Sequence, residues 1–187
     1  MLHASGSYIL PKNVPANEFL NLEGEKISTS KNWAVWLHDY LEEFPNQQDV
    51  LRYVLTSNAP ETKDNDFTWE EFQSRNNNEL VAIYGNFINR VVVLTNKYYE
   101  GIIPEIKSRL PEDEKIIGQI GIITKKIGSS IEKYKFRKAS QNLMRIARIG
   151  NKYLAENEPW KLIDKDPKRV SEIINTALQI TACLALV

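Results

Sequence analysis

The segment from Thr68 to Tyr99 constrains the fold most, because it has the pattern of one uninterrupted helix of 32 residues. Thr68 and Glu71 form a capping-box signature at its start, and Gly101 closes its end. At about 1.5 Å per residue, a helix of this length spans roughly 48 Å. Its apolar positions keep near-helical spacing: Phe72, Leu80, Tyr84, Phe87, Ile88, Val91, Leu94 and Tyr98. We therefore expect this helix to be the spine of a bundle.

Three more helical patterns follow the long one. Pro111 is a favoured first helical residue, and a pattern of isoleucines follows it on one helix face. A further pattern covers about Phe136 to Ala155, and Asp166 with Pro167 opens the last. The isoleucines are Ile116, Ile120, Ile123, Ile127 and Ile131.

The chain before Thr68 is less uniform. The first 31 residues contain short apolar runs around Glu23-Gly24, which predicts strands joined by a tight turn and followed by a loop. From Asn32 the period changes to that of a helix, which we expect Asn32 to cap and Pro45 to stop. A shorter helix is expected over residues 47–58, and "APETKDNDF" after it has turn chemistry.

These patterns together predict a mainly α fold. We expect a helical bundle over residues 67–187, preceded by a small mixed α/β region over residues 1–66. The oligomeric state does not follow from these patterns.

Composition excludes several classes of protein. Lys and Arg total 24, as do Asp and Glu, so no overall charge attracts the chain to nucleic acid or membrane. The single cysteine, Cys183, gives no disulfide framework, which favours a reducing, cytoplasmic setting. No apolar run is long enough to span a membrane. His3 and His38 are isolated from any cysteine or carboxylate pair, so we predict no metal site.

One short loop has chemistry suited to phosphate. The stretch "KISTSK" presents Lys26, Ser28, Thr29, Ser30 and Lys31 within six residues. Ammonium and hydroxyl groups are what the oxygens of a polyphosphate require. The alternative is a solvated turn that merely leads into the next helix.

A basic stretch lies further along the chain. Residues 133–155 contain seven Lys or Arg and no Asp or Glu. Lys138, Arg145, Arg148 and Lys152 share one helical face, which either follows a phosphate backbone or is simply solvated.

Three side chains have the chemistry of base recognition. Asn86 and Arg90 are four residues apart on the long helix, and both side chains offer forked hydrogen bonding to a base edge. Trp160 follows Pro159 between two helices and is either a stacking platform or a buried plug. The alternative for Asn86 and Arg90 is that they tie helices together.

The chain resembles methionyl-tRNA synthetases over essentially its whole length. The resemblance is carried by "FLNLEGEKISTSKNWAVWL", "DVLRYVLTSNAPETKDNDFTWEEFQSRNNNEL", "GNFINRVVVLTNKYYEG" and "ENEPW". It implies that "KISTS" stands where class I synthetases have KMSKS, the loop that holds the ATP phosphates. Thr29 replaces the second lysine of that signature, and we expect Lys31 to supply the missing charge.

The same resemblance implies a role in anticodon recognition. It assigns Asn86 and Arg90 to the first base of the CAU anticodon of tRNA(Met). Trp160 would stack on the unpaired bases, with Pro159 setting the turn. The basic face of Lys138, Arg145, Arg148 and Lys152 is a weaker candidate for backbone contacts.

We expect the chain to be a portion of a longer enzyme, because the family's nucleotide-binding domain would precede the loop. ATP and magnesium would then be used only by the complete ligase, with no cofactor held by this portion. Two alternatives are the tRNA-binding part of another class I synthetase and a helical scaffold that binds protein.

Overall fold

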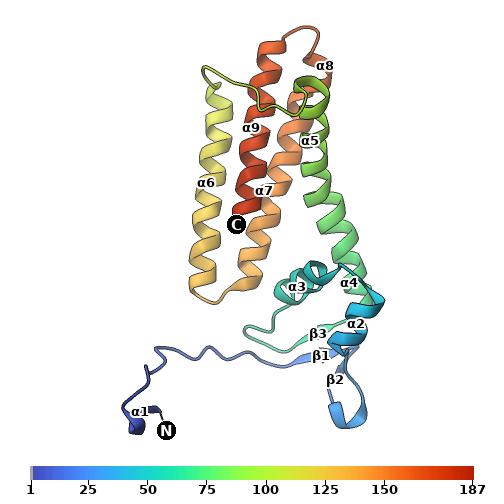
Figure 1. Ribbon diagram of the computed structural model, residues 1–187, viewed down its shortest axis with the longest axis vertical. Helices are drawn as coiled ribbons and strands as arrows, with labels where there is room; N and C mark the ends of the chain where they lie inside the picture. Colours follow the sequence, from blue (N-terminus) through green and yellow to red (C-terminus); the bar gives the residue numbers. More distant parts are fainter. Residues whose placement is uncertain (1) are drawn as a thin grey trace.

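The computed structural model describes residues 2–187 and has two parts (Figure 1). A tall bundle is built from four long helices, and a smaller part with a sheet lies at its lower end. The smaller part contains α1 (Leu2–Ser5), β1 (Leu20–Leu22), β2 (Glu25–Lys26), η1 (Thr29–Lys31), α2 (Leu37–Glu43), α3 (Gln48–Ser57), β3 (Asn65–Phe67) and α4 (Trp69–Arg75). The rest comprises η2 (Asn76–Gly85), α5 (Asn86–Tyr99), α6 (Pro111–Glu132), α7 (Phe136–Asn157), α8 (Pro159–Leu162) and α9 (Pro167–Leu186).

The small sheet has the strand order β2-β1-β3. β1 and β2 are antiparallel, and Glu23 and Gly24 between them both have positive φ angles, 51° and 79°, as a two-residue hairpin turn requires. β3 lies parallel to β1 on its other side. The predicted turn at Glu23-Gly24 is confirmed, whereas β3 falls in a segment predicted to be a turn.

The prediction that Asn32 caps a helix is wrong. Asn32 has a left-handed backbone with φ 52°, and the helix α2 begins five residues later, after Trp36. Trp33 instead pairs back onto the loop, with backbone bonds to Ser28 of 2.8 and 2.9 Å. Its indole donates to the Leu22 carbonyl at 3.1 Å. These contacts outweigh the local helical pattern and fold the chain back over the sheet.

The long helix is confirmed as one continuous helical segment. The Thr68 hydroxyl accepts a hydrogen bond from the Glu71 amide at 3.1 Å. The Glu71 carboxylate accepts a hydrogen bond from the Arg75 guanidinium at 2.7 Å, so it pairs with a residue one turn further along the helix. Ten residues in the middle, η2, are a π-helix, a wider form that the sequence does not predict.

The bundle core lies between α5, α6, α7 and α9, as predicted (Figure 1). α7 is packed closely against α5, because Gly150 has no side chain where Phe87 approaches it. A second, smaller core joins the sheet to α2, α3 and α4. Phe72 of α4 packs in this smaller core, while the division between residues 66 and 67 stays a prediction. Among the described residues, no helix is long and apolar enough to cross a membrane.

Candidate functional site

The "KISTSK" loop is exposed at the lower end of the molecule (Figure 1). Lys26 ends β2, with its ammonium 5.5 Å from the centre of the Phe19 ring. The 3-10 turn η1 follows, and the Ser28 and Ser30 hydroxyl oxygens lie 3.2 Å apart. The backbone bridge between Ser28 and Trp33 closes the base of the turn. The hydroxyl groups are therefore gathered on a short, hydrogen-bonded turn.

The cations of this loop suit an anionic ligand. Lys26 and Lys31 are both exposed, and in the part of the chain that the structure describes neither forms an ion pair with a carboxylate. Thr29 lies between them in η1. The residue types and their exposure therefore suit an anionic group such as a phosphate. Among residues 2–187 no cluster of His, Cys, Asp or Glu could hold a metal ion.

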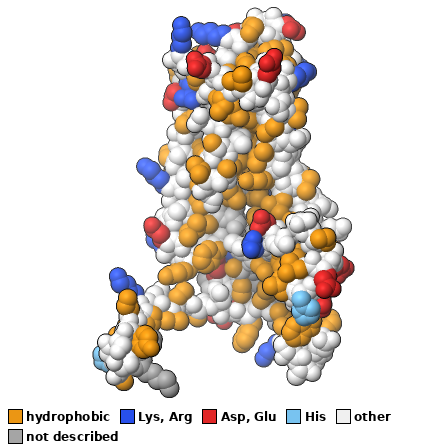
Figure 2. Space-filling model, viewed as in Figure 1, with side chains coloured by type: hydrophobic (Ala, Val, Ile, Leu, Met, Phe, Trp, Pro, Cys, Tyr) orange, Lys and Arg blue, Asp and Glu red, His pale blue; other side chains and the backbone are white. Residues whose placement is uncertain are grey.

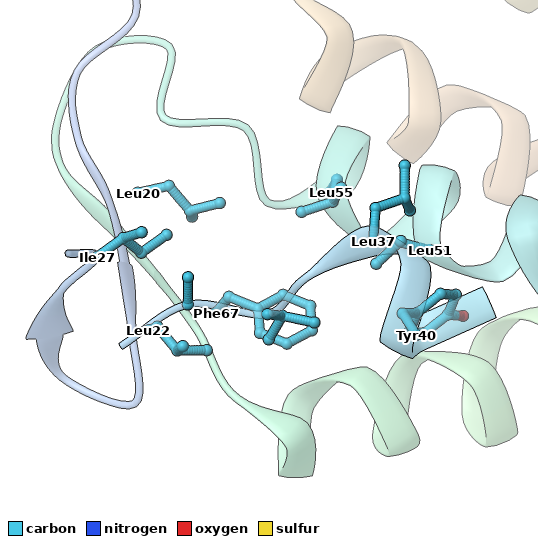
Figure 3. Close-up of a pocket in the computed structure, with 10 residues that line it drawn as sticks. Leu20, Leu22, Ile27, Leu37, Tyr40, Leu51, Leu55 and Phe67 are labelled. Carbon is cyan, nitrogen blue, oxygen red and sulfur yellow. The ribbon is translucent and has the colours of Figure 1, made fainter. Parts of the chain in front are cut away.

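An apolar cleft lies beside this loop (Figure 3). Its volume is about 250 Å³, and Leu20, Leu22, Ile27, Leu37 and Leu55 point into it with the rings of Tyr40 and Phe67. Hydrophobic side chains also gather on the surface of this smaller part of the molecule (Figure 2). The exposed ones include Val35, Trp36, Leu37 and Leu41. The helical spacing of these residues in the sequence thus marks an exposed apolar surface more than a buried helix face.

The structure brings Arg90 and Trp160 together at the opposite end of the molecule. The Arg90 guanidinium carbon lies 5.2 Å from the centre of the Trp160 ring, which is a cation–π arrangement. Trp160 is 37% exposed and lines a groove on the surface. Trp160 is therefore not a buried plug, while its role as a stacking platform stays a prediction.

Asn86 lies one helical turn before Arg90 and is also exposed. Its amide nitrogen donates to the Asn151 side-chain oxygen at 3.1 Å. The Asn151 nitrogen in turn donates to the carbonyl of Ile83 at 2.8 Å, so the orientation of both amides is set by the packing of α7 on η2. The oxygen of the Asn86 amide remains available as an acceptor, while its nitrogen is engaged.

The sequence did not predict every residue of this surface. A groove of about 230 Å³ is lined by Asn89, Arg90, Val93, Leu94 and Trp160. Asn89 and Val93 are close to Arg90 in the sequence of one helix, so the sequence contained a local signal that they could line the same groove. Asn151 had no such signal, because its contact with Asn86 depends on how α7 packs.

The α7–α8 corner positions Trp160. Glu158 has a left-handed backbone with φ 41°, and its amide donates to the Leu154 carbonyl at 3.1 Å to end α7. Pro159 is buried as the first residue of α8. A proline at this position restricts the backbone at the start of α8, the helix that carries Trp160.

A buried ion pair is connected to this corner through Asn157. Asp113 is 0% exposed and accepts from Arg169 at 2.5 and 3.0 Å and from the Tyr153 hydroxyl at 2.7 Å. Arg169 also donates to the Asn157 side chain at the end of α7. Burial opposes ionisation of Asp113, but the hydrogen bonds from Arg169 and Tyr153 outweigh it and hold the pKa of the carboxyl below its usual value.

The basic face of α7 is divided by the structure. Arg148 lies 4.0 Å from Glu79, and Lys152 lies 3.6 Å from Glu156, so two of the four cations face carboxylates. Lys138 and Arg145 instead line a cleft between α7 and α6. The four residues therefore have different neighbours, and their contact with an RNA backbone stays a prediction.

Comparisons with known proteins identify the class of protein that has this fold and these sites. Residues 1–92 match the family described as tRNA synthetases class I (M), and residues 103–187 match the family described as the anticodon binding domain of methionyl tRNA ligase. The two matches cover nearly the whole chain and define a class I aminoacyl-tRNA synthetase. Within that class, the chain belongs to the methionyl-tRNA synthetase family.

Individual relatives agree with this assignment. The chain is 68% identical over 187 residues to a methionine–tRNA ligase of Christiangramia forsetii and 65% identical over 186 residues to one of Flavobacterium johnsoniae. All of this chain is matched in both cases, but it spans only about 27% and 26% of their lengths.

A solved structure has the same fold. Mycobacterium tuberculosis methionyl-tRNA synthetase in complex with methionyl-adenylate matches 98% of this chain with a TM-score of 0.87 and 22% identity. The match covers 36% of that protein's chain.

Proposed function

We propose that this chain recognises the CAU anticodon of tRNA(Met) as part of a methionine–tRNA ligase. The observation that carries the proposal is the pairing of Arg90 with a half-exposed Trp160, one helical turn from the exposed Asn86. Single-stranded bases are read by aromatic stacking together with hydrogen bonds to their edges, and this surface offers both.

Each side chain has a separate role in the proposal. Arg90 and Asn86 contact the cytosine: the Asn86 oxygen accepts from its amino group, and the Arg90 guanidinium donates to its ring acceptors. Trp160 stacks on the neighbouring unpaired bases with its free face. Arg90 also lies over the indole, so this cation–π contact holds both the stacking surface of Trp160 and the guanidinium donor of Arg90 in place.

The "KISTSK" loop has its role in the complete enzyme. Lys26 and Lys31 neutralise the ATP phosphates, and the hydroxyls of Ser28, Thr29 and Ser30 donate hydrogen bonds to their oxygens. Lys31 supplies the charge that Thr29 lacks. Magnesium would be bound by ATP itself and by parts of the enzyme outside this loop, and the ligase would work in the cytoplasm.

The test is binding of this chain to tRNA with the CAU anticodon, and to the same tRNA with its cytosine changed, at one fixed salt concentration. We expect tighter binding to CAU. Trp160→Ala should weaken binding by about 1 to 3 kcal/mol, the usual contribution of one stacked base. Arg90→Ala should remove the preference for cytosine.

Matched variants control this test. Trp36 is exposed to the same degree as Trp160, 38% against 37%, but lies in the other part of the molecule. Trp36→Ala should leave the preference for cytosine intact, and so should Arg52→Ala, which removes an exposed arginine from α3. Equal affinity of the unaltered chain for both tRNAs would refute anticodon recognition, and the absence of any tRNA binding would favour the protein-binding scaffold.

A further inference from the structure

A second cluster of cations lies at the lower end of α6 and α7, where a short connection joins the two helices (Figure 1). Lys126, Ser129 and Lys133 occur at intervals of three and four residues on α6 and its C-cap, so they share one helical face. Lys138, Asn142 and Arg145 have the same spacing on α7. The two faces meet across a cleft of about 290 Å³.

The cations of this cleft lack acidic partners. Among the described residues, none of Lys126, Lys133, Lys138 and Arg145 forms an ion pair with a carboxylate. Four positive charges around one cleft repel each other. An anion bound in the cleft would attract each of the four cations and so offset their mutual repulsion.

The floor of the cleft gives an independent indication of a ligand. Asn142 is only 6% exposed, yet its side chain makes no hydrogen bond within the part of the chain that the structure describes. The amide atoms are not among the fully buried polar atoms without a partner, so they reach the solvent of the cleft and can take a partner there. Asn142 lines the cleft, where its NH₂ group can donate to an oxygen of a bound anion.

We propose that this cleft binds a phosphate group of the RNA backbone, separately from the anticodon surface. The proposal rests on the proposed binding of tRNA and adds a contact that carries no base information. Lys126, Lys133, Lys138 and Arg145 neutralise the phosphate, and Asn142 and Ser129 donate hydrogen bonds to its oxygens. The separate Arg148 and Lys152 already face carboxylates and make no part of the site.

The test is the salt dependence of binding of the whole chain to CAU tRNA. The double substitution Lys126→Ala with Lys138→Ala is compared with Lys115→Ala with Lys125→Ala, which removes the same charge from α6 outside the cleft. The cleft variant should lose about tenfold in affinity. The slope of log K against log salt should fall by about one. Both effects should be equal for CAU tRNA and for tRNA with the cytosine changed.

Asn142→Leu separates binding from folding. It keeps every positive charge, so tRNA affinity should fall while the salt slope stays the same. The thermal midpoint should stay about the same, because the amide has no hydrogen bond within the described part of the chain to lose. A clear fall in the midpoint would mean that Asn142 stabilises the fold, and the assignment of Asn142 to the phosphate would be withdrawn.

Other outcomes overturn the proposal. Equal losses in the cleft variant and in the α6 control variant would mean that only overall surface charge matters. Inorganic pyrophosphate is the probe for a free anion: if its binding is lost in the cleft variant while tRNA affinity is unchanged, the cleft does not hold RNA. Failure of the anticodon proposal is distinguishable from these outcomes. In that case the unaltered chain would bind CAU tRNA and the tRNA with the changed cytosine equally well.

Discussion

Gly150 allows α5 and α7 to approach each other next to the proposed anticodon surface of Asn86, Arg90 and Trp160. A Cβ atom added at Gly150 would lie 2.5 Å from two carbons of the Phe87 ring and 2.8 Å from a third. Carbon atoms in contact are normally about 3.5 to 4.0 Å apart, so the overlap is about 1 Å. Phe87 is 0% exposed and cannot move into solvent. Gly150→Ala therefore forces the two helices apart.

The expected magnitude has two opposing contributions. Overpacking a core costs about 1 to 3 kcal/mol. Replacing glycine by alanine within a helix contributes about 1 kcal/mol of stability. Gly121 on α6 provides the matched control, because nothing lies within 4 Å of a Cβ added there. The free energy of unfolding should therefore be about 1 to 3 kcal/mol lower for Gly150→Ala than for Gly121→Ala.

The assay is urea denaturation followed by the helical circular dichroism signal. Phe87→Leu combined with Gly150→Ala should reduce the penalty of the second substitution, since the smaller side chain leaves room for the new methyl group. Gly150→Ala should also weaken the preference for cytosine, because Asn151 and Asn86 next to the contact would separate. An equal gain in stability from Gly150→Ala and Gly121→Ala would refute the close approach.

Three other substitutions test separate parts of the structure. Thr68→Ala removes the helix cap and should cost about 0.5 to 2 kcal/mol in thermal unfolding; an unchanged midpoint would contradict the cap. The Asp113 pKa is lowered in the folded state, so its contribution to stability is present above the unfolded pKa of about 3.9 and is lost as the pH falls below it. Asp113→Asn should cost up to about 3 to 5 kcal/mol at neutral pH by removing the buried carboxylate that pairs with Arg169, which keeps its contact with Glu172, and should flatten the acid loss of stability. Lys31→Ala, made in the complete ligase that contains this chain, should slow methionyl-adenylate formation, whereas the control Lys12→Ala should leave the rate unchanged. An unchanged rate for Lys31→Ala would reject the role of Lys31.

The sequence predicted helices well where a long apolar stripe and a terminal signal agree. α6 and α9 begin at Pro111 and Pro167, as expected from proline at the first helical position. Asp166 also accepts a hydrogen bond from the Arg169 amide as its cap. Prediction failed between residues 32 and 36, where a local pattern competes with contacts across the sheet. It also missed η2, because the cap at Thr68 and the apolar residues of α5 predict a helix over the whole segment but do not distinguish its π form.

The sequence alone determined the mainly helical class, and it gave the positions of the KISTSK loop and of Asn86, Arg90 and Trp160 as candidate site residues. Those properties depend on neighbours within a few positions along the chain. Only the tertiary structure decided which of these side chains meet: Arg90 and Trp160 are far apart in sequence but 5.2 Å apart in space. It also decided that Arg148 faces Glu79 while Arg145 faces a cleft without a carboxylate partner. The reason is that periodicity gives the buried face of each helix, whereas contacts between helices depend on their rotation and separation, which long-range packing fixes.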